Sequence, residues 1–363
     1  MEVSGFVKEP AVKIQEIPTP ALLVDLETME SNLRLMACFF ADKPARLRPH
    51  FKNHKAPMLA WKQLRMGAIG MTCATIREAE ILVQHGIESI LIANEITGEW
   101  KTDRYAQLSR HASLMVGVDH PAQIRDLARA QRKYGTTLQV LIDVDSGLGR
   151  CGVKPGQQAV DLAKLATHEG LRVRGITGYE GHLQPLPAGP ERDEKVHAVC
   201  RDLVQTRTMM EAAGIPTDVI STGGTGTYAV CGSYPGITEV QAGSYLLMDT
   251  QYRNRGAPFR RALTVLVSVI STRGSNHAVI DCGVKELSAE RGLSEVKDAP
   301  GVTLKALHAE HGLLELDANS SHPLEVGQKI ELWVQYSDAT VNLHTSLYGV
   351  RNGQTEEVFP IIH

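Results

Sequence analysis

The chain has 363 residues, of which 43% are hydrophobic and 22% charged, as is usual for a globular protein with one large domain and a smaller one. A net charge of −3 argues against nucleic acid or an anionic membrane as a partner, and no apolar run approaches membrane-spanning length. The six cysteines lack CxxC spacing, and the N-terminus lacks an apolar signal core. We therefore expect a cytoplasmic protein with reduced thiols and a small-molecule substrate.

From about residue 19, short apolar or β-branched runs alternate with longer amphipathic stretches. Eight runs are predicted as strands: 20–25, 46–52, 69–75, 89–94, 113–119, 138–145, 173–179 and 218–222. A stretch of helical length follows each run. This alternation predicts an α/β fold with a (β/α)8 TIM-type barrel over residues 19–255, whose site lies at the C-terminal ends of the strands. A doubly wound open sheet would show the same alternation.

After about residue 256 the pattern changes to short strands separated by Gly, Pro, Asn or Ser, with hardly any helical period. The predicted strands are 262–272, 276–282, 302–308, 312–316, 328–334, 341–350 and 357–361. The pattern predicts a C-terminal all-β domain over residues 256–363. Residues 1–18 are expected to pack against it.

Lys52 is the first candidate for chemistry. It is predicted at the end of the second strand, after the extended Arg48–Pro49 step, with His50, His54 and Lys55 beside it. Neighbouring positive charge lowers the pKa of a lysine, which a Schiff-base lysine requires. The alternative for these residues alone is a solvated basic loop.

Two turns rich in small residues are candidates for an anion site. Ser221–Gly226 follows the strand at 218–222, and its glycines allow backbone N–H groups to converge on a phosphate. In barrels the phosphate site often follows the last two strands. Gln241–Tyr245 is a second turn of this kind. A tight turn without a ligand is the alternative.

Further candidates follow two other strands. Arg150 lies on a glycine-flanked loop, where it could hold a phenolate or carboxylate or form a surface ion pair. Tyr179, Glu180 and His182 offer an aromatic face, a carboxylate and an imidazole. One lysine, one arginine, one tyrosine and a phosphate-type turn at successive barrel loops are the groups that pyridoxal 5′-phosphate needs.

The same residues carry a family resemblance. The chain resembles the fold type III (alanine racemase-like) pyridoxal-phosphate enzymes, in the branch of D-threonine aldolase, 3-hydroxy-D-aspartate aldolase and D-serine dehydratase. Four stretches occur in the family's order: Arg48–Lys55, Asp143–Val153, Gly223–Gly226 and Thr238–Tyr245. The resemblance extends from residue 19 to residue 350.

The resemblance implies a role for each of these residues. Lys52 would form the Schiff base, Arg150 would contact the ring oxygen, and Tyr179 would pack on or bond to the pyridine ring. The phosphate would be held by residues of the two turns, namely Thr222, Gly224, Thr225, Gly226, Gly243, Ser244 and Tyr245. A homodimer with active sites near the subunit interface is also implied.

The chain departs from this family near its C-terminus. The aldolases and dehydratases bind a divalent metal through a His-x-Asp or His-x-Cys pair, which here is Tyr336 and Asp338. A further aspartate of the aldolases falls at Ala309. Because neutral tyrosine is a poor ligand, we predict no tightly bound metal, with Asp338 as the residual candidate.

The catalytic base is a second point of departure. The histidine thought to act in D-threonine aldolase falls at Pro185, so His182 or Glu180 would have to take its place. We count Lys52, His182, Glu180 and Tyr336 as the candidate catalytic residues. For His182 and Glu180 a structural hydrogen bond to the loop backbone is the alternative.

The resemblance of the stretches Arg48–Lys55 and Thr238–Tyr245 to the aldolases implies a pyridoxal-phosphate lyase that cleaves D-configured β-hydroxy amino acids by a retro-aldol reaction. Elimination to an oxo acid and ammonia, as in D-serine dehydratase, and racemisation are the alternatives among enzymes. A non-catalytic pyridoxal-phosphate carrier is the alternative outside enzymes. The β-domain argues against the carrier, because carriers of this fold resemble the barrel alone.

Overall fold

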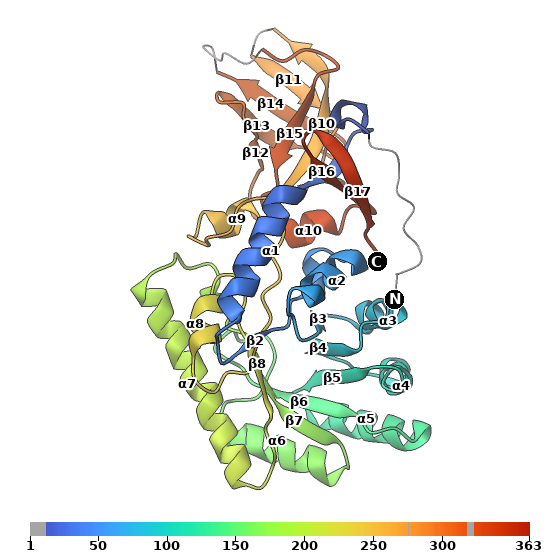
Figure 1. Ribbon diagram of the computed structural model, residues 1–363, viewed down its shortest axis with the longest axis vertical. Coiled ribbons are helices and arrows are strands. Elements are labelled where there is room, and N and C mark those ends of the chain that lie inside the picture. Colours follow the sequence, from blue (N-terminus) through green and yellow to red (C-terminus); the bar gives the residue numbers. More distant parts are fainter. Residues whose placement is uncertain (1–11, 275, 318–322) are drawn as a thin grey trace.

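The structure is a computed structural model that describes residues 12–274, 276–317 and 323–363. It contains two sheets, one barrel-like and ringed by helices, the other built mainly from the C-terminal third of the chain (Figure 1). No helix in these described ranges is both long and apolar enough to cross a bilayer.

The first sheet has eight parallel strands in the order β2-β9-β8-β7-β6-β5-β4-β3. A parallel bridge between His50 and Thr72 joins the two ends of this order. The strands are β2 (Arg46–Leu47), β3 (Met71–Cys73), β4 (Ser89–Glu95), β5 (Ser113–Val118), β6 (Gln139–Asp143), β7 (Arg172–Thr177), β8 (Val219–Thr222) and β9 (Glu239–Val240). The helices between them are α2 (Pro57–Arg65), α3 (Ile76–Gln84), α4 (Glu99–Leu108), α5 (Pro121–Tyr134), α6 (Gln157–His168), α7 (Pro190–Ala212) and α8 (Tyr228–Ser233). The predicted TIM-type barrel is confirmed.

A buried ion pair fixes the first and last barrel strands. Arg48, just after β2, donates to both carboxylate oxygens of Glu239 on β9, at 2.9 and 2.6 Å. Both side chains are almost fully buried, so the two-point contact sets the register where water cannot compete. The loops that follow these two strands therefore start from a fixed geometry.

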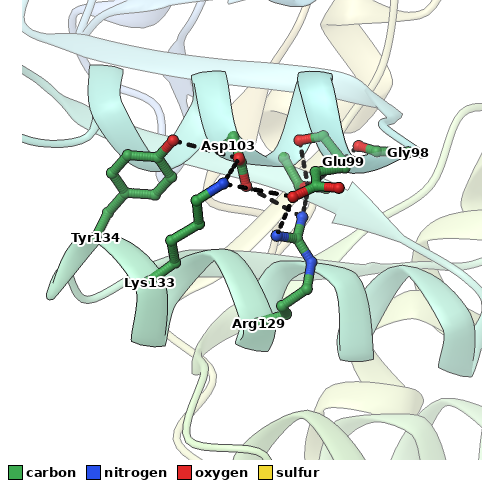
Figure 2. Close-up of polar contacts among 7 residues, drawn as sticks. Gly98, Glu99, Asp103, Arg129, Lys133 and Tyr134 are labelled. Carbon is green, nitrogen blue, oxygen red and sulfur yellow. Dashed lines mark hydrogen bonds and ion pairs between the residues drawn. The ribbon is translucent and has the colours of Figure 1, made fainter.

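The outer helices are tied to each other by charges. On α5, Lys133 donates to Asp103 of α4 at 2.6 Å, and Arg129 pairs with Asp103 and Glu99, both at 3.1 Å (Figure 2). The Lys133 ammonium and the Arg129 guanidinium hold the pKa of the Asp103 carboxyl below its usual range. These contacts lie outside the barrel and stabilise its wall.

The second sheet has nine strands, with β13-β14-β11-β10-β1-β16-β17 in order and β15 pairing with β10 and β12. Its strands are β1 (Ala21–Asp25), β10 (Leu263–Arg273), β11 (His277–Ile280), β12 (Glu295–Val296), β13 (Val302–Leu307), β14 (Gly312–Leu316), β15 (Lys329–Trp333), β16 (Ser346–Arg351) and β17 (Gln354–Pro360). Three further helices are α1 (Leu26–Phe40), α9 (Thr250–Arg253) and α10 (Ser337–Val341). The predicted strand-rich C-terminal region is confirmed.

The prediction that residues 20–25 form the first barrel strand is wrong. They form β1, which lies between β10 and β16 in the second sheet. A continuous apolar run suits a strand buried on both faces, and such strands occur in barrels and in the middle of open sheets alike. The last barrel strand is instead β9, a two-residue strand too short to be recognised as a periodic run.

The N-terminal segment is described only from residue 12. Lys13 forms a β-bridge with Gln354, the first residue of β17, and Ile17 packs with Leu23 and Leu266. Residues 12–17 therefore lie against the second sheet, while residues 1–11 fall outside the described part. The predicted domain boundaries, 19–255 and 256–363, stay predictions.

Candidate active site

A cavity of about 340 Å³ lies at the C-terminal ends of the barrel strands and reaches α10. Eight of the predicted site residues line it: Lys52, Arg150, Tyr179, Gly224, Thr225, Gly243, Ser244 and Asp338. Six others are absent from its lining: Thr222, Gly226, Tyr245, Glu180, His182 and Tyr336. The structure thus brings the predicted lysine, arginine, tyrosine and small-residue turns into one cavity.

Lys52 lies in a 3-10 turn, η2 (Phe51–Asn53), and not at the end of a long strand as predicted. The strand ends at Leu47, and the His50 imidazole accepts a hydrogen bond from the Lys52 N–H at 3.4 Å. The turn directs the lysine into the cavity, where its Nζ lies 3.4 Å from Oδ2 of Asp338. The amine is therefore accessible and has one anionic neighbour.

The prediction that His50 and His54 add positive charge beside Lys52 is wrong. Burial lowers the pKa of His50 well below its usual value, and the charges of Lys52, His54 and Arg150 lower it further. Burial also lowers the pKa of His54 to about 4. Both imidazoles are consequently neutral near pH 7. The side chain of Lys55 turns away and donates to Asn342 at 2.5 Å.

The two turns of small residues follow β8 and β9, the last two strands of the barrel. At Gly243 a Cβ atom would lie 2.8 Å from the carbonyl oxygen of His50, closer than real Cβ contacts occur. Only glycine therefore lets this turn approach the turn that carries Lys52. Within the described ranges, the backbone N–H groups of Thr225 and Ser244 have no protein acceptor. The turns form a small cradle with free donors, which suits a phosphate.

Glu180 supports the first of these turns from behind. It is fully buried, and its Oε2 accepts from the Thr222 hydroxyl at 3.0 Å and from the Gly223 N–H at 3.2 Å. Its Oε1 accepts from the Thr227 hydroxyl at 2.5 Å and from the Gln184 amide at 3.0 Å. All four donors belong to the turn or its supports, so Glu180 is engaged away from the cavity.

Gln184 completes this support. Its Oε1 accepts from the N–H of Gly226 at 2.9 Å, and the N–H of Gly224 is taken by the Thr227 hydroxyl at 3.0 Å. A Cβ at Gly224 would lie 2.8 Å from the Gln184 amide nitrogen. The conformation of the turn is thus fixed by side chains, and the N–H groups of Gly224 and Gly226 are already used.

Arg150 and two tyrosines form another part of the cavity wall. The Arg150 guanidinium carbon lies 5.7 Å from the centre of the Tyr179 ring. Burial raises the pKa of Tyr179 strongly, and the nearby charges of Glu180 and Asp338 raise it further. Tyr252 also lines the cavity, and burial likewise raises its pKa well above the usual value. Both hydroxyls therefore stay protonated and can donate.

The remaining predicted residues lie outside the cavity lining. His182 is exposed in the turn η3 (Gly181–Leu183), with its ring beside Gly147. Tyr336 precedes α10 and lies under Arg291, whose guanidinium carbon is 5.6 Å from the ring centre. Burial raises the pKa of Tyr336 to about 12. Tyr245 is fully buried, and its hydroxyl accepts from Gln63 at 3.0 Å.

Asp338 is held by contacts across the two parts of the molecule. Its Oδ1 accepts from the Asn53 amide at 2.8 Å, and that amide also donates to Ser337 at 2.9 Å. The Ser337 hydroxyl donates in turn to Asp249 at 2.9 Å. Asn53 adjoins Lys52, so this network fixes the carboxylate relative to the lysine.

The residues at Asp338 do not fit a divalent metal. Among the residues that the structure describes, Asp338 belongs to no group of three His, Cys, Asp or Glu ligands. Its oxygens are engaged by Asn53 and Lys52, and the flanking Tyr336 is a protonated phenol. Ala309 has no ligand atom in its side chain. A single carboxylate with a neighbouring ammonium is a poor cation site.

The structure brings four acidic or thiol side chains together beside the cavity, a cluster that was not predicted from the sequence. One potential ligand atom each from Glu95, Asp119 and Cys151 lies within 4.8 Å of the others. Asp143 lines the cavity, and burial together with Glu95 and Asp119 raises its pKa to about 8. These residues come from the ends of three strands and the loop after β6, so only the barrel brings them together. Tyr252 was missed for a similar reason, because nothing in its flanking sequence marks it.

Comparison with known proteins extends over nearly the whole chain. Residues 24–251 match the family described as "Alanine racemase, N-terminal domain", and residues 262–350 match "Putative serine dehydratase domain". D-Threonine aldolase from Arthrobacter sp is 33% identical, with 97% of this chain and 94% of that protein covered. 3-Hydroxy-D-aspartate aldolase from Paracoccus denitrificans (strain Pd 1222) is also 33% identical, with 97% and 93% covered.

A solved structure is also similar to this chain over nearly its whole length. The crystal structure of D-threonine aldolase from Filomicrobium marinum superimposes with a TM-score of 0.94 at 35% identity, and 97% of each chain is covered.

Proposed function

This chain belongs to the alanine racemase-fold family that includes D-threonine aldolase and 3-hydroxy-D-aspartate aldolase, and from that premise we propose that it is a pyridoxal-phosphate lyase. Its substrate would be a D-configured β-hydroxy amino acid, cleaved by a retro-aldol reaction. The observation that carries the proposal is the cavity in which Lys52, Arg150 and the two small-residue turns meet.

The residues of the cavity fit the cofactor. The amine of Lys52 would hold its aldehyde covalently, and the cradle at Thr225 and Ser244 would bind its phosphate. Arg150 would contact the ring oxygen, and Tyr179 would pack beside the ring. When bound, pyridoxal phosphate supplies an acceptor for the electrons released at Cα of the substrate. The protein then has to bind the amino acid, exclude water and move protons.

The roles of the remaining candidates follow from their contacts. Glu180 would act as a positioning residue for the phosphate turn, because four donors already occupy its oxygens. His182 is exposed, which weakens its candidacy as a base. Tyr336 would support α10. Gly226, Thr222 and Tyr245 would shape the turns without lining the cavity themselves.

We also propose that the protein works without a tightly bound metal, as a cytoplasmic homodimer. The poor fit of a cation at Asp338 supports the first point. The six cysteines are free, which agrees with a reducing compartment. The resemblance to the alanine racemase fold supports the dimer, and sedimentation analysis of the holoenzyme would test it.

Product analysis tests the reaction. The holoenzyme is incubated with D-threonine, D-phenylserine, 3-hydroxy-D-aspartate, D-serine and L-alanine. An aldehyde with glycine supports the retro-aldol reaction. An oxo acid with ammonia would instead favour a dehydratase, which the match to the serine dehydratase domain keeps open. An enantiomer would favour a racemase. A carrier would be favoured if no substrate were turned over and the near-visible absorbance band of the cofactor did not shift when any of these amino acids was added.

A further inference from the structure

Asp338 has the contacts of a reacting group and lacks those of a metal ligand. Its Oδ2 lies 3.4 Å from the Lys52 amine and its side chain lines the cavity, whereas Tyr336 and Ala309 offer no metal ligands around it. The family resemblance places a metal ion at this position to act on the β-hydroxyl. This chain keeps the carboxylate and has lost the residues that would hold the ion.

We propose that Asp338 itself binds the substrate's β-hydroxyl and takes its proton. This inference rests on the proposed lyase function and names the base for it. A substrate amine that replaced the Lys52 amine would place its nitrogen near the present position of Nζ, 3.4 Å from Oδ2 of Asp338. The β-oxygen is three bonds from that nitrogen, which is close enough for the same carboxylate to contact it when the hydroxyl points toward α10.

The surroundings of Asp338 suit this role. Asn53 holds Oδ1 at 2.8 Å and leaves Oδ2 directed toward the cavity. Tyr179 and Tyr252 have raised pKa values, to which Asp338 contributes, so their hydroxyls stay protonated near the carboxylate. In this structure Oδ2 contacts the Lys52 amine at 3.4 Å, and a substrate that displaced this amine would leave Oδ2 as the acceptor for its β-hydroxyl. A fixed acceptor at the reacting position is what general-base catalysis requires.

The step balances as follows. The proton of the β-hydroxyl passes to Asp338, and the O–H electron pair becomes the second bond of the aldehyde C=O. The Cα–Cβ bond breaks, and its electron pair stays on Cα. Cα then takes up one proton to give glycine, and Asp338 returns its proton to solvent. No oxidant, reductant or metal is needed.

The test compares Asp338→Asn with wild-type holoenzyme and with Glu310→Gln, an exposed acid of the same region that pairs with Lys285. For the substrate that wild type cleaves, Asp338→Asn should lower kcat about 100-fold or more, as loss of a general base does, while Glu310→Gln changes nothing. D-Alanine has no β-hydroxyl, so its shift of the near-visible cofactor band should keep the wild-type dissociation constant in both variants. A changed D-alanine response in Asp338→Asn would indicate a merely structural role and overturn the proposal.

A second experiment tests whether activity depends on a metal ion. Wild-type activity should survive EDTA, and elemental analysis should find no stoichiometric metal. Installing the missing ligands with Tyr336→His and Ala309→Asp should create Mn²⁺ binding, measured by equilibrium dialysis. Wild-type activity that is lost in EDTA and restored by Mn²⁺ would overturn the proposal.

A third measurement separates this proposal from the function on which it rests. If wild type cleaves no β-hydroxy substrate, the lyase proposal fails, yet binding can still be compared by the band shift. D-Threonine should then bind about 10-fold tighter than D-2-aminobutyrate, as a hydrogen bond to a charged group allows, and Asp338→Asn should remove the difference. Equal affinities in wild type would overturn the role of Asp338.

Discussion

The two walls of the cavity differ in how closely they follow the family pattern. The wall at the barrel strand ends carries Lys52, Arg150 and the two small-residue turns, all in the order that the resemblance implies. The second wall, at α10, keeps only Asp338 of the expected ligand set. The first wall would hold the cofactor, whereas the second would act on the substituent at Cβ. Under the proposed function, the first wall keeps the family's residues for the cofactor, and the second differs from the family at the group that acts on Cβ.

The two walls are also built differently. At the phosphate turn, three backbone N–H groups each have a side-chain acceptor: Glu180 and Gln184 from the loop after β7, and Thr227 from the end of the turn itself. At α10, a single chain of hydrogen bonds from Asp249 through Ser337 and Asn53 fixes the carboxylate. The hydrogen bonds at the phosphate turn hold the backbone itself, whereas those that fix the Asp338 carboxylate run through side chains.

The largest effect is expected from Lys52→Ala. Loss of the amine should abolish the near-visible cofactor band and lower activity at least about 1,000-fold, as removal of a covalent catalytic group does. Absorbance spectra and product analysis measure both. Lys55→Ala is the matched control, because the Lys55 side chain contacts Asn342 outside the cavity lining. A Lys52→Ala protein that kept its band would refute the assignment of the barrel wall.

Gly243→Ala tests the approach of the two turns. The added Cβ would meet the His50 carbonyl oxygen at 2.8 Å, and relieving such a contact costs about 1–3 kcal/mol. We expect affinity for pyridoxal phosphate to fall about 10-fold or more, measured by titration of the apoprotein. At Gly117 on β5 a Cβ would have an ordinary contact of 3.5 Å, so Gly117→Ala should keep its affinity.

Glu180→Gln separates support of the turn from acid–base chemistry. The NH2 group of glutamine cannot accept a hydrogen bond, so the two donors that face it, of the four around Glu180, lose their acceptor, at about 1–3 kcal/mol. Cofactor affinity and the free energy of unfolding should fall together. The kcat of the fully loaded variant should stay within a few-fold of wild type. A large fall in kcat with unchanged affinity would show that Glu180 is catalytic after all.

The smallest effect is expected from pH. The pKa of Asp143 is raised to about 8, so between its usual value near 4 and pH 8 the folded state binds a proton that the unfolded state has released. The free energy of unfolding should therefore fall as pH rises through this window. Asp143→Asn should flatten that slope and stabilise the protein at pH 8.5, where the wild-type carboxyl is ionised. Thermal denaturation at pH 6 and 8.5 measures it, and an unchanged slope would contradict the burial of this carboxyl.

Much of the fold was predictable because it rests on local pattern. The helices and longer strands were recognised from apolar periodicity, which survives in any tertiary setting. Strand β9 was missed because two residues show no period, and β1 was misplaced because its apolar run suits either sheet. Residues 20–25 were correctly predicted as a strand, but its partners were not, because β10 and β16 lie far away in the sequence.

The sequence by itself determined the alternation of strands and helices, the family resemblance, and the lysine, arginine and turns of the cofactor wall, because each depends on residue type and order. Tertiary structure alone decided which side chains face the cavity. It buried Glu180 under the turn, left His182 exposed, made His50 and His54 neutral, and placed Asp338 against Lys52. Burial and distance set the charge and reach of a group, and neither is encoded in its neighbours along the chain.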